Sequence, residues 1–194
     1  TVKRERDEAW ADVSEARIAV ATDPLTEIAN RRGLALRFRD PAHPRPAALA
    51  VIDCDHFKRI NDMFGHDTGD EVLIAVAEGL KQENVFPARQ GGEEFVVGVS
   101  GLADEDLFRL GEAVKSELAQ CNFDAIAPAL RITTSIGIAQ GIADGPFDTL
   151  YRQADDALYA AKHAGRNRVI IADISSARHQ VITTLVSGID RVHM

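Results

Sequence analysis

The chain has 194 residues, 45% hydrophobic and 27% charged, enough for one sizeable core but too few for two independent domains. Its formal net charge of -8 excludes a broad electrostatic surface for a nucleic acid polymer, so any phosphate must be bound locally. The two cysteines, Cys54 and Cys121, lack the spacing of a metal or disulfide site, which fits a reducing compartment.

Residues 1–22 are predicted to form an N-terminal helix. Apolar side chains recur there at heptad-like spacing: Val2, Ala9, Val13, Ala16 and Val20. This pattern is typical of a short parallel coiled coil. A lone amphipathic helix that folds back on the domain has the same pattern, so both interpretations stay open.

The start of the chain lies inside this helical pattern and lacks Met, so we expect a fragment of a longer protein whose upstream sensor domain is missing. The sequence has no signal peptide and no apolar stretch of about 18 residues that could cross a bilayer. We therefore expect this fragment to be cytoplasmic and to make no membrane contact of its own, even where the whole protein is membrane-attached.

Helix and strand patterns alternate through the middle of the chain. A helix over residues 25–39 is expected after the break at Asp23-Pro24. The next expected elements are a strand at 47–52, helices at 56–64 and 70–80 joined by a turn, a hairpin with strands at 85–86 and 95–99, a helix at 105–119, a strand at 131–139, a helix at 149–164 and a strand at 168–172. This interleaving predicts an α+β fold with a mixed sheet flanked by helices.

The last residues, 173–194, carry apolar side chains at three-or-four spacing, which predicts a C-terminal helix. That helix could pack on the same domain, on a partner helix or on a second subunit. The chain thus divides into an N-terminal helix over 1–22, a globular domain over 23–172 and an extension over 173–194.

The segment Gly91-Gly92-Glu93-Glu94-Phe95 lies between two β-prone runs, and its glycine pair is a strong hairpin signal. Glycine lets a phosphate approach the backbone, and an adjacent carboxylate can hold the divalent cation that accompanies phosphates. The segment therefore predicts a phosphate and metal site at a hairpin tip, although a plain turn with solvated glutamates has the same pattern.

A second acidic element, Asp53-Cys54-Asp55, directly follows the apolar run at 47–52, which predicts a buried strand. Carboxylates at the end of a buried strand, beside a carboxylate on a neighbouring hairpin, are typical of Mg²⁺ sites in phosphoryl and nucleotidyl transfer. We interpret Asp53 as a metal ligand and Asp55 as the N-cap of the next helix.

With both acidic elements placed, the chain resembles the GGDEF family of diguanylate cyclases, here with a Gly-Gly-Glu-Glu-Phe signature, over about residues 23–169. Further matching motifs lie at 23–26 (DPLT), 30–32 (NRR), 53–58 (DCDHFK), 60–62 (IND), 65–66 (GH), 69–70 (GD), 134–139 (TSIGIA), 154–155 (AD), 157–159 (ALY), 161–162 (AK) and 165–167 (GRN).

The resemblance implies a palm-like sandwich of the nucleotide cyclase and polymerase type, with a central mixed antiparallel sheet. It implies the condensation of two GTP molecules to cyclic di-GMP and two pyrophosphates, with Mg²⁺ as the cofactor, which Mn²⁺ can replace. It also implies an antiparallel homodimer with one GTP per subunit, in which each 3′-hydroxyl attacks the α-phosphate held by the partner.

The family pattern also assigns residue roles. It places Asp53, the backbone carbonyl of Cys54 and Glu93 on the metal. Either Glu93 or Glu94 would help to deprotonate the attacking 3′-hydroxyl, and the pattern favours Glu93. The phosphate contacts are assigned to Lys58, Lys162, Arg166, Gly91 and Gly92.

Asn61 and Asp70 match the guanine-reading positions of the family. A carboxylate can accept from N1–H and the exocyclic amine of guanine, whereas adenine presents an acceptor and a misplaced amine. The resemblance therefore implies selection of GTP over ATP. His66 lies in the turn between these two positions, where we expect it to order the loop or to contact the ligand.

The chain also departs from the family pattern. Glu27 and Ile28 replace the usual glycine and leucine of the helix-opening motif, and Gln90 stands where tyrosine is common. The shortened segment over residues 80–90 lacks the Arg-x-x-Asp inhibitory site of many relatives. We therefore expect no product inhibition through that site.

The main alternative function is a catalytically silent module that binds GTP or a protein and regulates another activity. Cyclases with a different product and a purely structural dimerisation unit are two further alternatives. Because each metal and base-reading position retains the family residue, the sequence favours an active diguanylate cyclase.

Overall fold

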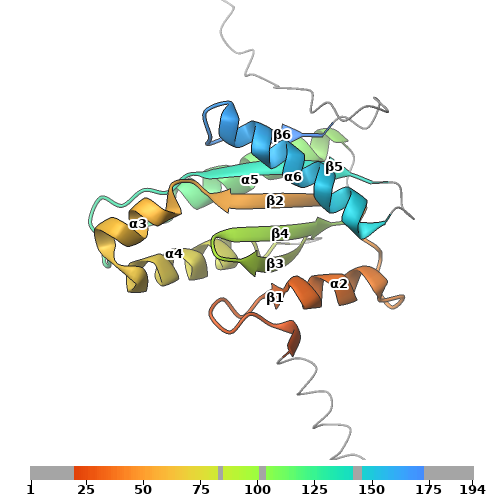
Figure 1. Cartoon of the computed structure of the whole chain (residues 1–194), viewed down its shortest axis with the longest axis horizontal. Helices are drawn as coiled ribbons and strands as arrows, with labels where there is room; N and C mark the ends of the chain where they lie inside the picture. Colours follow the sequence, from red (N-terminus) through yellow and green to blue (C-terminus); the bar gives the residue numbers. More distant parts are fainter. Residues whose placement is uncertain (1–19, 83–84, 101–103, 142–145, 173–194) are drawn as a thin grey trace, which may run out of the picture.

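Six strands form one sheet with helices on both faces in the computed structural model, which describes residues 20–82, 85–100, 104–141 and 146–172 (Figure 1). The elements are β1 (Ala29–Asn30), α2 (Arg31–Arg39), β2 (Ala48–Cys54), α3 (Phe57–Phe64), α4 (His66–Gly79), β3 (Val85–Gly91), β4 (Glu94–Val99), α5 (Asp104–Ala119), β5 (Thr134–Gln140), α6 (Phe147–His163) and β6 (Val169–Ile171). Residues 1–19 of the predicted coiled coil and the whole predicted helix over 173–194 lie outside the described residues. Among the described helices, none is long and apolar enough to cross a membrane.

The strand order is β1-β3-β4-β2-β5-β6. Strand β2 lies inside the sheet and is antiparallel to both β4 and β5. The outer strands β1 and β6 run parallel to β3 and β5. The predicted α+β fold with a mixed sheet is therefore confirmed.

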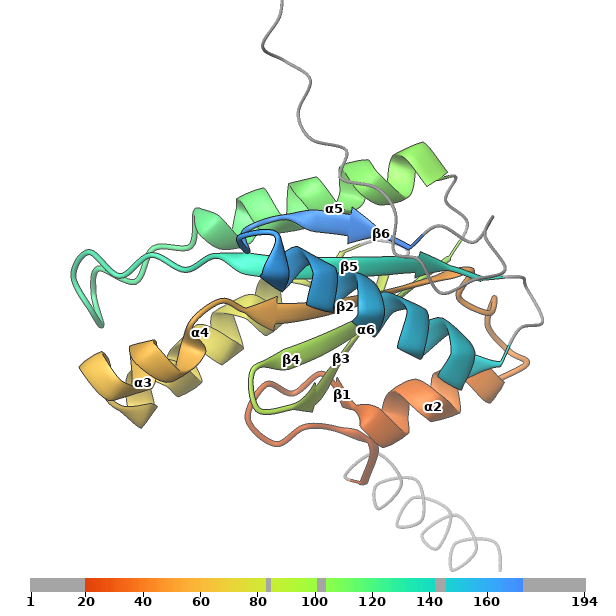
Figure 2. The same cartoon turned by 45° about the horizontal axis from the view of Figure 1, so that its top comes forward.

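Strand β2 is buried along its whole length and contributes to the core on both faces of the sheet. Ala50 and Ile52 pack with side chains of α4 and α5, whereas Leu49 and Val51 pack with side chains of α2 and α6. Helices α5 and α6 lie on opposite faces of the sheet (Figure 2). Because strand residues alternate between faces, Asp53 belongs to the second set. The end of β2 thus presents a carboxylate on the α6 side of the sheet.

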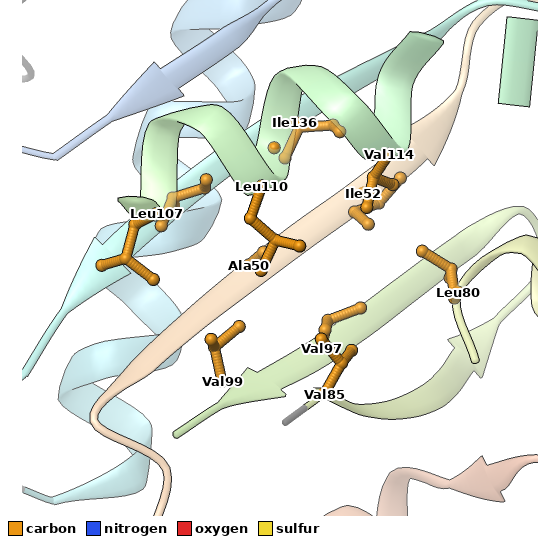
Figure 3. Close-up of a pocket in the computed structure, with 12 residues that line it drawn as sticks. Ala50, Ile52, Leu80, Val85, Val97, Val99, Leu107, Leu110, Val114 and Ile136 are labelled. Atoms are coloured by element: carbon orange, nitrogen blue, oxygen red, sulfur yellow. The ribbon is translucent and has the colours of Figure 1, made fainter. Parts of the chain in front are cut away.

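On the opposite face, the core leaves a small apolar cavity of about 20 Å³ between α5 and the sheet (Figure 3). Its walls include Ala50, Ile52, Val97, Leu107 and Val114. The volume is close to that of one water molecule, and apolar cavities of this kind stay dry. The cavity therefore reflects imperfect packing under α5.

The helix predicted over residues 25–39 begins later than expected, because β1 and a turn occupy its first part. Asn30 caps α2, since its side-chain oxygen accepts from the backbone N–H groups of Arg32 and Gly33 at 2.9 and 3.1 Å. Glu27 has a φ of 59°, so the helical path is already broken before Asn30. The prediction was wrong for Leu25–Asn30.

Helix α4 begins at His66, four residues before the predicted start at Asp70. Gly65 has a φ of 87° and separates α3 from α4, so a single residue makes the turn that was expected to extend to Gly69. The hydroxyl of Thr68 donates to the carbonyl of Phe64 at 3.1 Å across this junction. Gly69 therefore lies inside a helix.

Candidate active site

The two acidic elements meet at one end of the sheet. Asp53 of β2 stands directly opposite Glu94 of β4 in the antiparallel register. The backbone N–H of Cys54 donates to the carbonyl of Glu93 at 3.4 Å. Since Gly92 and Glu93 form the β3–β4 turn, the hairpin brings its carboxylates beside the end of β2. We call Asp53, Glu93 and Glu94 the acidic cluster.

Lys162 of α6 joins this cluster. Its ammonium nitrogen lies 2.7 Å from Oδ2 of Asp53, whose side chain is 8% exposed. Burial raises the pKa of Asp53, against the opposing effect of Lys162. Burial and the neighbouring Asp53 charge likewise raise the pKa values of Glu93 and Glu94. The cluster thus carries more negative charge than one lysine can offset.

The donors at this end of the sheet fit a hard divalent cation. Nowhere in the described part of the chain do three His, Cys, Asp or Glu side chains gather to hold a metal ion. The predicted ligand set needs only the carboxylates of Asp53 and Glu93 and the carbonyl of Cys54, all oxygen donors of the kind Mg²⁺ prefers. The Cys54 thiol is buried in the core on the face of the sheet opposite Asp53, and burial raises its pKa.

Arg166 brings a second positive charge to this end of α6. It follows the helix with a φ of 64°, and its charge acts on Asp53 to oppose the rise of that pKa. The structure therefore groups Lys162 and Arg166 with the acidic cluster, although they lie more than 100 residues beyond Asp53 in the sequence.

The predicted guanine-reading residues lie on α3 and α4. The side-chain oxygen of Asn61 is buried and has no hydrogen-bond partner in the described structure. It lies against Gly69, where an added Cβ would collide with it, and the next residue, Asp70, is exposed. Asn61 thus lies beside the residue that precedes Asp70, and its amide oxygen has acceptor capacity that no described residue uses. His66 is exposed at the start of α4.

Lys58 lies on α3, one turn before Asn61, and its side chain is exposed. Gly91 and Gly92 both have positive φ, at 146° and 55°, and a Cβ added to either would meet open space. The backbone at the hairpin is therefore accessible, as the approach of a phosphate requires.

Asp55 is not a helix cap, so that prediction was wrong. Its Oδ1 accepts from the hydroxyl of Ser135 at 2.7 Å, and its Oδ2 accepts from the hydroxyl of Thr133 at 2.7 Å and the backbone N–H of Asn167 at 3.0 Å. The residue that precedes α3 is His56, which makes no side-chain cap. Asp55 instead ties the end of β2 to β5 and to the segment before β6.

Sequence reasoning missed the role of Arg89 on β3. Its Nη1 lies 3.1 Å from Oδ1 of Asp23, and its Nε and Nη2 donate to the carbonyl of Gly92 at 3.1 and 2.9 Å. Burial acts to raise the pKa of Asp23, but hydrogen bonds from Thr26 and the pair with Arg89 hold it below its usual value. The Asp-x-x-Thr turn was visible in the sequence, whereas its distant arginine partner was not.

Gln90, the departure next to the glycine pair, lies in a β-bulge, because the β3–β4 register shifts between Arg89 and Gly91. Gln90 acts on the pKa of Tyr151 of α6 to oppose its rise. Burial raises the pKa of Tyr151, and nearby carboxylates add to the effect. A phenol from α6 therefore lies near Gln90 and Glu94 of the hairpin.

Comparison with known proteins gives a family match. Residues 20–168 match the family model described as "Diguanylate cyclase, GGDEF domain". The chain is 39% identical to diguanylate cyclase DgcP of Pseudomonas aeruginosa over 168 residues, which cover 82% of this chain and 25% of that protein. It is 37% identical to diguanylate cyclase DgcM of Escherichia coli over 161 residues, which cover 77% of this chain and 38% of that protein. The chain thus spans well under half of each relative.

Solved structures agree with this match. The coiled coil and GGDEF domain of DgcB from Caulobacter crescentus, in complex with c-di-GMP, superposes with a TM-score of 0.74 at 29% identity, covering 88% of this chain and 95% of that one. The active GGEEF domain of a diguanylate cyclase from Vibrio cholerae gives a TM-score of 0.62 at 34% identity, and the match covers 75% of this chain and 98% of that one. The comparison of structures and the comparison of sequences therefore both point to proteins with GGDEF domains.

Proposed function

Because the chain belongs to the GGDEF domain family of diguanylate cyclases, we propose that it condenses two GTP molecules to cyclic di-GMP and two pyrophosphates. The observation that carries this proposal is the acidic cluster, which lies beside an open glycine backbone and Lys162. That combination suits a polyphosphate with its cation. We also propose a cytoplasmic location, where GTP is available.

Asp53, the carbonyl of Cys54 and Glu93 would hold Mg²⁺, and Mn²⁺ could take the same oxygen ligands. When bound, the ion neutralises phosphate charge and lowers the pKa of the attacking 3′-hydroxyl. Burial raises the pKa values of Glu93 and Glu94 in the metal-free chain, and a raised pKa makes a carboxylate that is not bound to the metal a better proton acceptor. Either can take the proton, and the family pattern assigns it to Glu93.

The cationic side chains would orient the triphosphate. Lys162 and Arg166 approach from α6 and would bind the terminal phosphates by charge-assisted hydrogen bonds. Lys58 projects from α3 and would offset charge that develops in the transition state. Gly91 and Gly92 admit the phosphates close to the hairpin backbone.

Base selection would rest on Asn61 and Asp70, with His66 ordering the start of α4. The buried amide oxygen of Asn61 lacks a partner in the described structure, and a guanine donor would satisfy it. A base without donors at these positions would leave both acceptors unpaired.

Each chain provides one acidic cluster and would bind one GTP, whereas the product contains two phosphodiester bonds. We therefore propose an antiparallel homodimer in which each subunit supplies the α-phosphate attacked by the other subunit's 3′-hydroxyl. We also propose that a sensor domain precedes this chain in the whole protein. Cyclic di-GMP would not inhibit the chain through an Arg-x-x-Asp site, since the sequence lacks one.

The direct test incubates the purified chain with GTP and Mg²⁺ and separates the nucleotides by chromatography. We expect cyclic di-GMP from the parent and from a Glu112→Gln control, which alters a surface glutamate of α5. Glu93→Gln should lower the rate by about 10²-fold or more, because it removes a metal ligand and proton acceptor. GTP binding without product in a dimeric sample would contradict the proposal and favour a silent regulatory module.

A further inference from the structure

A second hollow lies against α3, between this helix and the segment that leads into β5. Its volume is about 310 Å³. Its walls include Arg59, Ile60, Met63, Phe64, Leu130 and Arg131. At 100° per residue, the α3 positions that line it lie on the side of the helix opposite Lys58 and Asn61. The hollow is therefore separate from the proposed nucleotide site.

Two arginines, Arg59 and Arg131, line the hollow in a chain whose formal net charge is -8. Arg59 is exposed and has no hydrogen-bond or ion-pair partner among the described residues. The Nη1 of Arg131 donates to the carbonyl of Leu130 at 2.7 Å and lies 3.3 Å from Asp124, and both charged side chains are more than half exposed. The one carboxylate in the wall, Asp55, accepts three hydrogen bonds from Thr133, Ser135 and Asn167. The Arg59 guanidinium and the Nε and Nη2 groups of Arg131 thus remain available to an anion.

The other walls are apolar and open to solvent. Met63 and Phe64 are 62% and 37% exposed, whereas Ile60 and Leu130 behind them are buried. Apolar side chains that line a concave surface are typical of small-molecule sites. A thioether and a phenyl ring suit a flat aromatic partner.

We propose that this hollow is a second ligand site, which binds a small aromatic phosphate monoester. The guanidinium forks of Arg59 and Arg131 match the oxygens of a phosphate dianion. The ring of the ligand lies on Met63 and Phe64. The volume falls at the lower end of the range for small-molecule sites, which begins near 300 Å³. This inference does not depend on the proposed cyclase activity.

Binding titrations of the full chain, without GTP or divalent metal, test the proposal with three probes. Phenyl phosphate should bind about tenfold more tightly than inorganic phosphate and more tightly than phenol, because only phenyl phosphate uses both parts of the hollow. Arg59→Gln and Arg131→Gln should each weaken phenyl phosphate binding by about tenfold. Arg109→Gln, an exposed arginine on α5, is the matched control and should leave binding unchanged.

A further variant distinguishes the contribution of the apolar side chains from that of the two arginines. Met63→Ser should weaken phenyl phosphate but leave inorganic phosphate unaffected. Thermal unfolding of each variant verifies the fold, since all these side chains are at the surface. Three results would each overturn the proposal: no binding of phenyl phosphate at millimolar concentration, equal binding of phenyl phosphate and inorganic phosphate, or loss of binding in Lys58→Met but not in Arg59→Gln.

Discussion

Asp53 and Glu94 are like charges directly opposite each other on antiparallel strands. Such pairs destabilise a sheet by about 0.2–1 kcal/mol. Burial raises the pKa of both groups, and the charge of Asp53 contributes to the rise at Glu94. The carboxylates that the proposed chemistry needs therefore weaken the fold that holds them.

Glu94→Gln should stabilise the metal-free chain by about 0.5 kcal/mol at pH 7.5. Because the folded pKa of Glu94 lies above its unfolded value, the folded state binds more protons between the two values and loses stability as pH rises through them. The gain should therefore vanish near pH 3.5, where the carboxyl is protonated in both states. Urea unfolding with a chelator at both pH values measures it. Glu71→Gln on the exposed face of α4 is the control, and an equal gain at both pH values would contradict the electrostatic explanation.

Asp55 connects β2 to β5 and to the segment before β6 through three hydrogen bonds. Asp55→Ala should lower the free energy of unfolding by about 3 kcal/mol, since it removes three hydrogen bonds to a buried charge and leaves the Ser135 hydroxyl unpaired. Asp62→Ala on the exposed side of α3 should change it by less than about 0.5 kcal/mol. Urea denaturation compares the two variants, and similar effects would mean that Asp55 does not tie these strands.

The turn before β1 offers a second test. Glu27 has a φ of 59°, a conformation that costs most residues about 1–2 kcal/mol and glycine little. After subtracting the greater unfolded-state entropy of glycine, Glu27→Gly should stabilise the chain by roughly 0.5 kcal/mol. Glu71→Gly, inside α4, should instead destabilise it by about 1 kcal/mol. Thermal unfolding decides, and destabilisation by both substitutions would refute the argument from backbone conformation.

Whether the sequence predicts an element depends on how far apart in the chain the interacting residues lie. The existence of strands β2 and β5 and of the β3–β4 hairpin was predicted, because their patterns are local, but the ends of β2 and β5 differ from the prediction by one to three residues and the turn lies at Gly92-Glu93. Strand β1 has two residues, too few to show a period. The role of Asp55 could not be predicted, because its partners lie 78 to 112 residues away. The meeting of both acidic elements was predicted, but the register that sets Asp53 opposite Glu94 required the structure.

The described part of the chain offers one acidic cluster for a product made from two nucleotides. If each turnover requires a dimer of two chains, specific activity should fall about tenfold for each tenfold dilution below the dimer dissociation constant. Rates of cyclic di-GMP formation across a dilution series, with sedimentation at the same concentrations, measure this. Constant specific activity in a monomeric sample would contradict the dimeric mechanism.

Arg89 links the entry of the domain to its hairpin. One side chain contacts Asp23, just after the chain enters at Thr22, and also the carbonyl of Gly92, next to Glu93. A mechanical displacement of the entry segment would thus reach the hairpin through a single rigid guanidinium, without rearrangement of the core. Because this connection runs through one side chain, different segments joined before Asp23 would act on the same hairpin.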